Sequence, residues 1–64
     1  MISITNIFSP DGTLEARTYI QDDIPVVEFY KESKLIDARS FPTNTVDYAL
    51  DAAENYTLGI LKIS

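Results

Sequence analysis

The first 41 residues alternate between hydrophobic and polar positions, a pattern that predicts β-strands. Residues 2–8 are rich in β-branched and aromatic side chains. In residues 13–21, Leu14, Ala16 and Ile20 fall on one face and polar side chains fall on the other, which is typical of a half-buried antiparallel strand.

Two further strands are predicted at residues 26–31 and 34–41. Turn sequences separate the strands, with Ser-Pro-Asp-Gly at 9–12 and Asp-Asp-Ile-Pro at 22–25. Between the third and fourth strands, residues 32–33 predict a tight hairpin, although favoured two-residue turns carry Gly or Asn rather than Glu-Ser.

The third and fourth strands are expected to pair so that apolar side chains meet. The expected partners are Phe29–Ile36, Val27–Ala38, Tyr30–Leu35, Val26–Arg39 and Glu28–Asp37. The last pair would set two carboxylates opposite each other and destabilise the sheet, a cost that a diagonal Arg39 would relieve.

Residues 44–59 form the only long helical pattern. Val46, Ala49, Leu50 and Ala53 recur at i, i+3, i+4 and i+7, so they form one apolar stripe that can cover the sheet.

The ends of this helix carry recognisable signals. Asn44 is the expected N-cap, and Asp47 adds negative charge in the first turn. Gly59 suits the left-handed position after a helix. The apolar residues 60–63 are expected to form a fifth strand, with a docked tail as the alternative.

The composition narrows the chemistry. Sixty-four residues make one small domain, residues 1–64, and a chain of this size is marginally stable alone. It has no Cys and no His, which excludes disulfides, the usual zinc sites and the common nucleophile–base pairs. With two glycines there is no phosphate-binding loop either. We therefore expect a protein that is not an enzyme, has no cofactor or metal, and self-associates for stability.

The charge and hydropathy bear on location and partners. Ten acidic and five basic residues give a net charge of −5, which disfavours non-specific attraction to phosphate. No leader or membrane-spanning run is visible, so the expected location is the cytoplasm, without membrane contact.

One candidate site combines cations with aromatic side chains, the combination that holds single-stranded nucleic acid by phosphate contact and base stacking. Its members lie on the polar faces of the strands or beside the hairpin: Arg17, Tyr19, Tyr30, Lys31, Lys34 and Arg39. The alternative is that Tyr30 and Leu35 pack in a subunit interface while the cations pair with Glu15, Glu28 and Asp37.

A second candidate site is an acidic stripe on the helix. Asp47, Asp51 and Glu54 share one face, which is either a solvated surface or a docking surface for a protein. A metal site there would lack ligands from any facing element.

The second half of the chain resembles a group of small proteins from marine metagenomes, of cyanophage type. The carrying features are Phe29-Tyr30-Lys31, Lys34-Leu35, Phe41-Pro42, the run 51–56 and Gly59-Ile60. The resemblance implies a phage-encoded, five-stranded barrel similar to Sm/LSm proteins, which closes into a homo-oligomeric ring and binds RNA or DNA. The chain lacks the Asn and the Arg-Gly pair of the Sm signature, so no base-contact residue transfers by position.

The predicted fold is therefore mainly β, a small five-stranded antiparallel Sm-like or SH3-like barrel with one helix between strands four and five. The alternative is an open ββββα meander with the helix on one face. The leading function is an oligomer that binds single-stranded RNA or DNA, and the alternative is an acidic protein-interaction module that docks through its helix.

Overall fold

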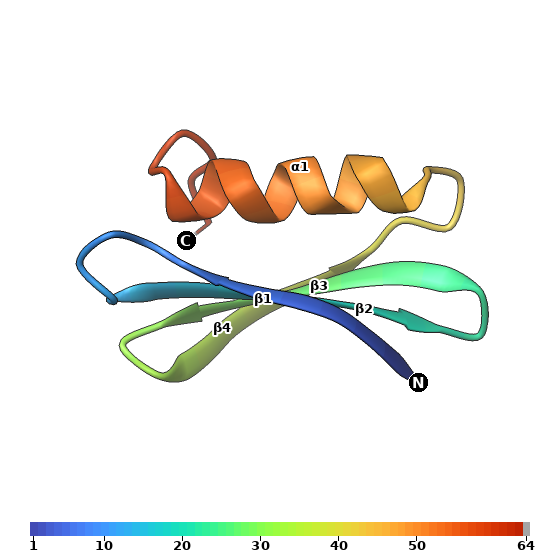
Figure 1. Ribbon diagram of the computed structural model, residues 1–64, viewed down its shortest axis with the longest axis horizontal. Helices are drawn as coiled ribbons and strands as arrows, with labels where there is room; N and C mark the ends of the chain where they lie inside the picture. The colour runs from blue at the N-terminus through green and yellow to red at the C-terminus, as the bar shows by residue number, and fades with distance from the viewer. Residues whose placement is uncertain (64) are drawn as a thin grey trace.

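The computed structural model describes residues 1–63 as a mainly β domain (Figure 1). Its elements are β1 (Ile2–Phe8), β2 (Leu14–Gln21), β3 (Ile24–Lys31), β4 (Lys34–Ser40) and α1 (Val46–Thr57). The strands form one antiparallel sheet in the order β1-β2-β3-β4, and α1 lies across one face. Among the described residues, no helix is long and apolar enough to cross a membrane.

The sheet is open, so the barrel prediction was wrong and the alternative, the meander with one covering helix, is confirmed. Residues 60–63 form no strand. The backbone N–H groups of Ile60 and Leu61 both donate to the carbonyl of Asn55, at 2.9 and 3.0 Å, and are therefore unavailable to a sheet. Instead, Leu61 and Ile63 pack against the core as a docked tail.

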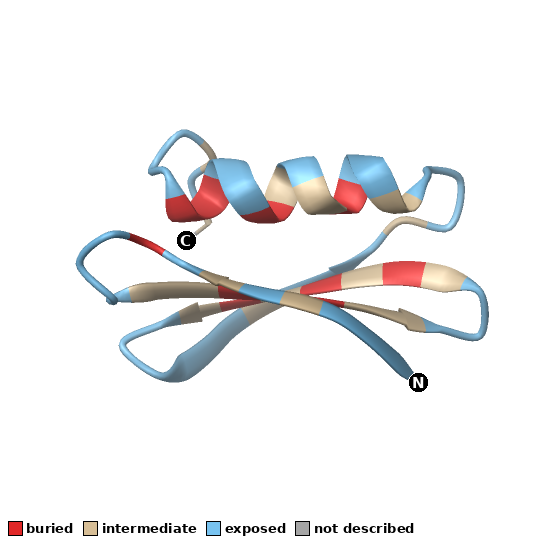
Figure 2. Ribbon diagram, in the orientation of Figure 1, coloured by how far each residue is buried: buried red, intermediate tan, exposed pale blue. Residues whose placement is uncertain are grey.

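The core lies between α1 and the central strands, where Figure 2 shows the buried positions of both layers facing each other. Its fully or almost fully buried members are Ala16, Val27, Phe29, Ala49, Ala53 and Tyr56. The small side chains of Ala49 and Ala53 let the helix approach the sheet closely. The rings of Phe29 and Tyr56 meet edge to face, with centroids 4.9 Å apart.

The helix begins one residue later than expected. Thr45, not Asn44, is the N-cap, and its hydroxyl accepts a hydrogen bond from the Tyr48 N–H at 3.3 Å. The predicted end is confirmed: Gly59 has φ +82°, and its N–H donates to the Tyr56 carbonyl at 3.1 Å. Together with the Ile60 bond to Asn55, this is the Schellman arrangement.

A β-bulge at Ile36 changes the expected pairing of β3 with β4. Tyr30 pairs with Leu35 as predicted, but beyond the bulge the register is shifted by one residue. The observed partners are Phe29–Asp37, Glu28–Ala38, Val27–Arg39 and Val26–Ser40.

The expected partners Phe29–Ile36, Val27–Ala38, Val26–Arg39 and Glu28–Asp37 were therefore wrong. A shift of one residue moves a side chain to the other face of a sheet. Asp37 and Arg39 consequently lie on the α1 side, and the predicted clash between Glu28 and Asp37 does not occur.

Two of the three hairpin turns place non-glycine residues in the left-handed region. Asp22 and Asp23 have φ of 53° and 64°, and Glu32 and Ser33 have φ of 51° and 69°. Paired positive φ values are what a type I′ turn requires, and this turn matches the twist of the flanking strands. The predicted hairpin at residues 32–33 is confirmed, and Glu32 and Ser33 occupy positions that favour Gly or Asn.

In the first turn, Asp11 organises the chain. One carboxylate oxygen accepts from the Ser9 hydroxyl at 2.7 Å and from the Thr13 N–H and hydroxyl at 3.0 and 2.9 Å. These hydrogen bonds, the one from Ser9 first, lower the pKa of Asp11 from 3.8 to about 2.

Replacing Glu32→Asn together with Ser33→Gly should stabilise the protein. Both new residues tolerate positive φ, so we expect a gain of about 1 kcal/mol and a rise in Tm of about 4–8 °C. Thermal unfolding followed by circular dichroism measures the change. Lys34→Gly is the control, because Lys34 lies in the extended backbone of β4, where Gly should lower Tm. A fall in Tm for the Glu32→Asn, Ser33→Gly variant would contradict the type I′ turn.

The stability that Asp11 contributes should be lost in acid. Because the folded state lowers its pKa, the contribution is present above about pH 4 and disappears as the pH falls from about 4 to about 2. Asp11→Asn keeps an acceptor but does not titrate, so its urea unfolding should depend less on pH in that interval. Ser9→Ala removes the largest cause of the lowered Asp11 pKa, so the pH dependence of its stability should lie between those of the wild type and Asp11→Asn. Identical pH profiles for all three proteins would refute the stabilising role of Asp11.

Candidate functional site

The structure divides the predicted nucleic-acid site among three places. Arg17, Tyr19 and Tyr30 lie together on the side of the sheet away from α1, which we call the open face. Arg39 lies on the opposite side, because its partner Val27 is buried under the helix. Lys31 and Lys34 pair with each other beside the β3–β4 turn. The six residues therefore do not form one surface.

On the open face, Arg17 is held by its neighbours. Its Nε donates to the Glu15 carboxylate at 2.7 Å, and its guanidinium carbon lies 4.3 Å from the centre of the Tyr30 ring. The hydroxyl groups of Tyr19 and Tyr30 both donate to Glu28, at 3.3 and 3.1 Å. The aromatic and cationic groups thus already bind carboxylates of the same face.

These contacts determine which charges the open face presents. Desolvation, and then the neighbouring Glu28, raise the pKa of Tyr19 and Tyr30, so both phenols stay neutral hydrogen-bond donors. Two carboxylates, Glu15 and Glu28, accompany one guanidinium. A phosphate that approached Arg17 would have to compete with the Glu15 carboxylate.

Arg39 repeats this arrangement on the other side of the sheet, where its Nε donates to Asp37 at 3.0 Å. Each arginine is therefore bonded to the carboxylate two residues before it on the same strand. Pairing of the cations with Glu15 and Asp37 is the alternative that the sequence analysis left open, and the structure contains both pairs.

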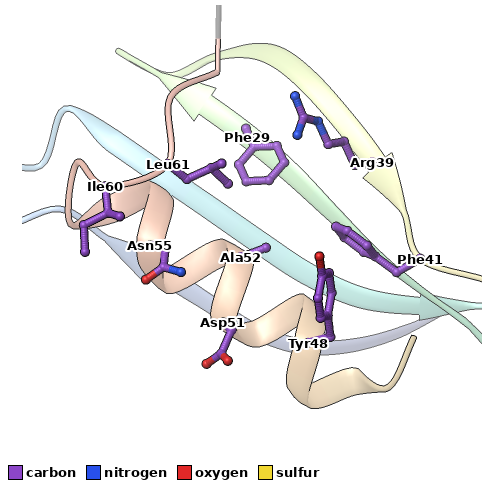
Figure 3. A pocket seen from close by; sticks show the side chains of 9 residues that line it. All are labelled: Phe29, Arg39, Phe41, Tyr48, Asp51, Ala52, Asn55, Ile60 and Leu61. Atoms are coloured by element: carbon purple, nitrogen blue, oxygen red, sulfur yellow. The ribbon is translucent and has the colours of Figure 1, made fainter. Parts of the chain in front are cut away.

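A hollow that was not predicted from the sequence lies between α1 and β4. The helix contacts β1, β2 and β3 but does not extend over β4. This leaves a groove of about 350 Å³, which we call the α1–β4 groove (Figure 3). Its lining residues are Phe29, Arg39, Phe41, Tyr48, Asp51, Ala52, Asn55, Ile60 and Leu61.

Apolar side chains dominate this groove. Phe41 and Tyr48 meet edge to face at one end of it, with ring centroids 5.4 Å apart, and Tyr48 remains 54% exposed. Ile60 is 69% exposed at the end near the helix C-terminus. Arg39, Asp51 and Asn55 provide the polar groups, and Figure 3 shows them around the apolar lining. Such a combination is typical of a binding pocket.

One sequence signal could have revealed the groove. Tyr48, Ala52 and Asn55 recur at i, i+4 and i+7, beside the buried stripe of α1, and therefore point toward β4. The position of Arg39 could not have been foreseen, because it depends on the bulge at Ile36.

The predicted acidic stripe is exposed along its whole length, but its members differ in surroundings. Of Asp47, Asp51 and Glu54, only Asp51 borders the α1–β4 groove. Within residues 1–63, no group of three or more acidic side chains is placed to hold a metal ion.

Comparisons with known proteins returned no matching family model, curated protein or solved structure.

Proposed function

We propose that this protein is a non-enzymatic, acidic interaction module that binds a basic segment of a partner protein in the α1–β4 groove. The observation that supports this most directly is the groove itself, with exposed aromatic and aliphatic side chains beside an acidic helix face. An exposed apolar surface is costly in water, and in a soluble protein it commonly marks a site of interaction.

The apolar part of the groove suits one anchoring side chain of a partner. Phe41 and Tyr48 form its walls at one end, and Ile60 and Leu61 form them at the other. Ala52, between them on the helix, is too small to fill the space. An aromatic or branched aliphatic side chain would bury its own surface and that of these residues at once.

The charge of the helix selects a basic partner. The helix carries Asp47, Asp51 and Glu54 and no basic residue, in a protein of net charge −5. A Lys or Arg next to the anchoring side chain would reach Asp51 at the edge of the groove. The overall charge would speed the encounter, and Asp51 would contribute a direct contact.

Catalysis fits this groove poorly. Its polar lining groups are Arg39, Tyr48, Asp51 and Asn55, and the chain contains no His or Cys. None of these groups forms a nucleophile–base pair with another in the structure. Binding therefore accounts for the site with fewer assumptions than a reaction does.

Selection from a library of displayed random peptides tests the proposal, followed by fluorescence anisotropy of the best labelled peptide. We expect the enriched sequences to place Lys or Arg beside an aromatic or branched aliphatic residue. Asp51→Lys should weaken the selected peptide at least about tenfold, which is about 1.4 kcal/mol.

Glu54→Lys is the matched control, because it makes the same charge change on the same helix face outside the groove lining. It should weaken binding less, through long-range attraction alone. Equal losses in both variants, no effect of Tyr48→Ala, or a selection that enriches no peptide would each count against the groove as the site.

Binding of single-stranded nucleic acid on the open face is the second candidate, and the stack of Arg17 on Tyr30 favours it. Phe8 and Tyr19 add aromatic surface to the same face. The resemblance to cyanophage proteins implies this activity, carried out by a homo-oligomer in the host cytoplasm. The carboxylates Glu15 and Glu28 oppose it, so several copies would have to act together.

The position of the two arginines on opposite faces gives this candidate a clean test. If the open face binds, Arg17→Glu should abolish the anisotropy change of labelled single-stranded RNA or DNA, and Arg39→Glu should leave it nearly unchanged. Each phosphate contact should contribute about 0.7 to the slope of log affinity against log salt. Absence of binding at low salt, or equal loss in both variants, would exclude the open face.

A further inference from the structure

The edge strand β4 has a free side. It pairs with β3 on one side only, α1 does not cover it, and all its residues except Asp37 are exposed (Figure 2). An uncovered edge offers unpaired backbone groups to any other strand, and natural proteins normally block such edges or use them.

The hydrogen bonds identify the groups that point outward. The Phe41 N–H donates to the Pro25 carbonyl at 2.8 Å, so Phe41 faces β3. Bonding alternates along an antiparallel pair, and Asp37 and Arg39 therefore also face β3 while Ala38 and Ser40 face outward. The Ala38 N–H instead donates to the side chain of Asp37, at 2.9 Å.

Asp37 therefore closes the edge of its own strand. One of its oxygens accepts from the Ala38 N–H, and the other accepts from Arg39 at 3.0 Å. The three groups lie at the surface, with the side chains of Asp37 and Arg39 39% and 48% exposed. Contacts at such exposed positions are readily exchanged for equivalent contacts with another molecule.

We propose that a second copy of this chain pairs with β4, antiparallel, about a two-fold axis at Ala38. In this register Ala38 faces the partner's Ala38, and each Asp37 faces the partner's Arg39. Ile36 faces the partner's Ser40. The result is a continuous sheet of eight strands with both α1 helices on the same side.

The charges of β4 single out this register. An axis at Asp37 would set two carboxylates opposite each other, and an axis at Arg39 would set two guanidinium groups opposite each other. If the register between the two β4 strands were shifted by one residue, side chains of the open face on one copy would lie opposite side chains of the α1 face on the other. An axis at Ile36 falls on the bulge. Only the axis at Ala38 opposes unlike charges on a regular stretch of strand.

Pairing replaces each intramolecular bond with an equivalent one. Asp37 leaves the Ala38 N–H and binds the partner's Arg39, and the Ala38 N–H then donates to the partner's Ala38 carbonyl. The other edge, β1, has no charged side chain in residues 2–8 and is bulged at Ile4, so nothing there selects a register.

The dimer goes beyond the proposed function and uses a different surface, the edge of β4 rather than the α1–β4 groove. A cysteine cross-link tests its register, because the chain has no Cys of its own. Across the axis, two residues at position 38 would have Cα atoms about 5.5 Å apart, within the range of a disulfide. Two residues at position 40 would be about 13 Å apart, since four residues of strand separate them.

We expect purified Ala38→Cys to form a disulfide-linked dimer under mild oxidation, seen on a non-reducing gel, and Ser40→Cys to remain largely unlinked. Equal cross-linking of both variants would overturn the register. Absence of cross-linking in both, together with a monomeric wild-type protein at a few hundred micromolar, would overturn the dimer.

Charge reversal provides an independent test by sedimentation equilibrium. Asp37→Arg alone and Arg39→Asp alone each oppose like charges and should give monomers. The two changes together restore opposite charges and should restore the dimer, whereas a dimer that persists in both single variants would refute the pairing. Circular dichroism verifies that each variant is folded.

Ala38→Pro separates this inference from the proposed function. Proline removes an outward N–H that the β3–β4 ladder does not use, so we expect a folded monomer. If Ala38→Pro still binds the selected groove peptide, the groove function stands independently of the dimer. If wild-type protein dimerises and no peptide binds, the dimer stands and the groove function fails.

Discussion

The contact between Phe29 and Tyr56 joins the two layers of this protein, and the other features depend on it. Both rings are buried, they meet edge to face, and the Tyr56 hydroxyl donates to the backbone carbonyl of Tyr30 at 2.9 Å. The bond fixes the helix above β3, because it connects a side chain of α1 to the backbone of the strand that carries Phe29. A chain of 64 residues without Cys has few other ways to hold a helix on a sheet. With α1 centred over β2 and β3, the face of β4 is left uncovered, and the groove results from that placement.

The elements whose formation depends on a local pattern of residues could be predicted from the sequence. The clean alternation of residues 13–21 identified β2, the two-residue hairpin identified the junction of β3 and β4, and Gly59 identified the end of the helix. The N-cap was placed one residue early, because Asn44 and Thr45 can both cap a helix and tertiary packing decides between them. The fifth strand was predicted from the β-branched run after Gly59. The sequence could not show that the helix end itself would bind the N–H groups of Ile60 and Leu61.

The candidate sites were less accessible to prediction than the fold. A bulge leaves no mark in the alternation of residues 34–41, because apolar residues occur there at both odd and even positions. The face occupied by Arg39 follows from the bulge, and for that reason the predicted cluster of cations and aromatics was split between two sides of the sheet.

The α1–β4 groove depends on where the helix stops short of the fourth strand, which is a property of the assembled layers. Arg17 and Arg39 each pair with the carboxylate two residues earlier, on the same face of the strand. This i, i+2 spacing is visible in the sequence, so these ion pairs could be predicted from it.

The strictly consecutive order of the strands has a consequence for how the chain folds. Every pair of neighbouring strands is joined by a short turn, so the whole sheet can assemble from contacts that are local in sequence. The helix follows all four strands, and its contacts with β1, β2 and β3 join residues that are far apart in the chain. The sheet can therefore form before α1 docks on it, with Val27 and Phe29 still exposed to water. Until the helix docks, the chain presents an apolar sheet face, and the packing of Tyr56 against Phe29 covers it.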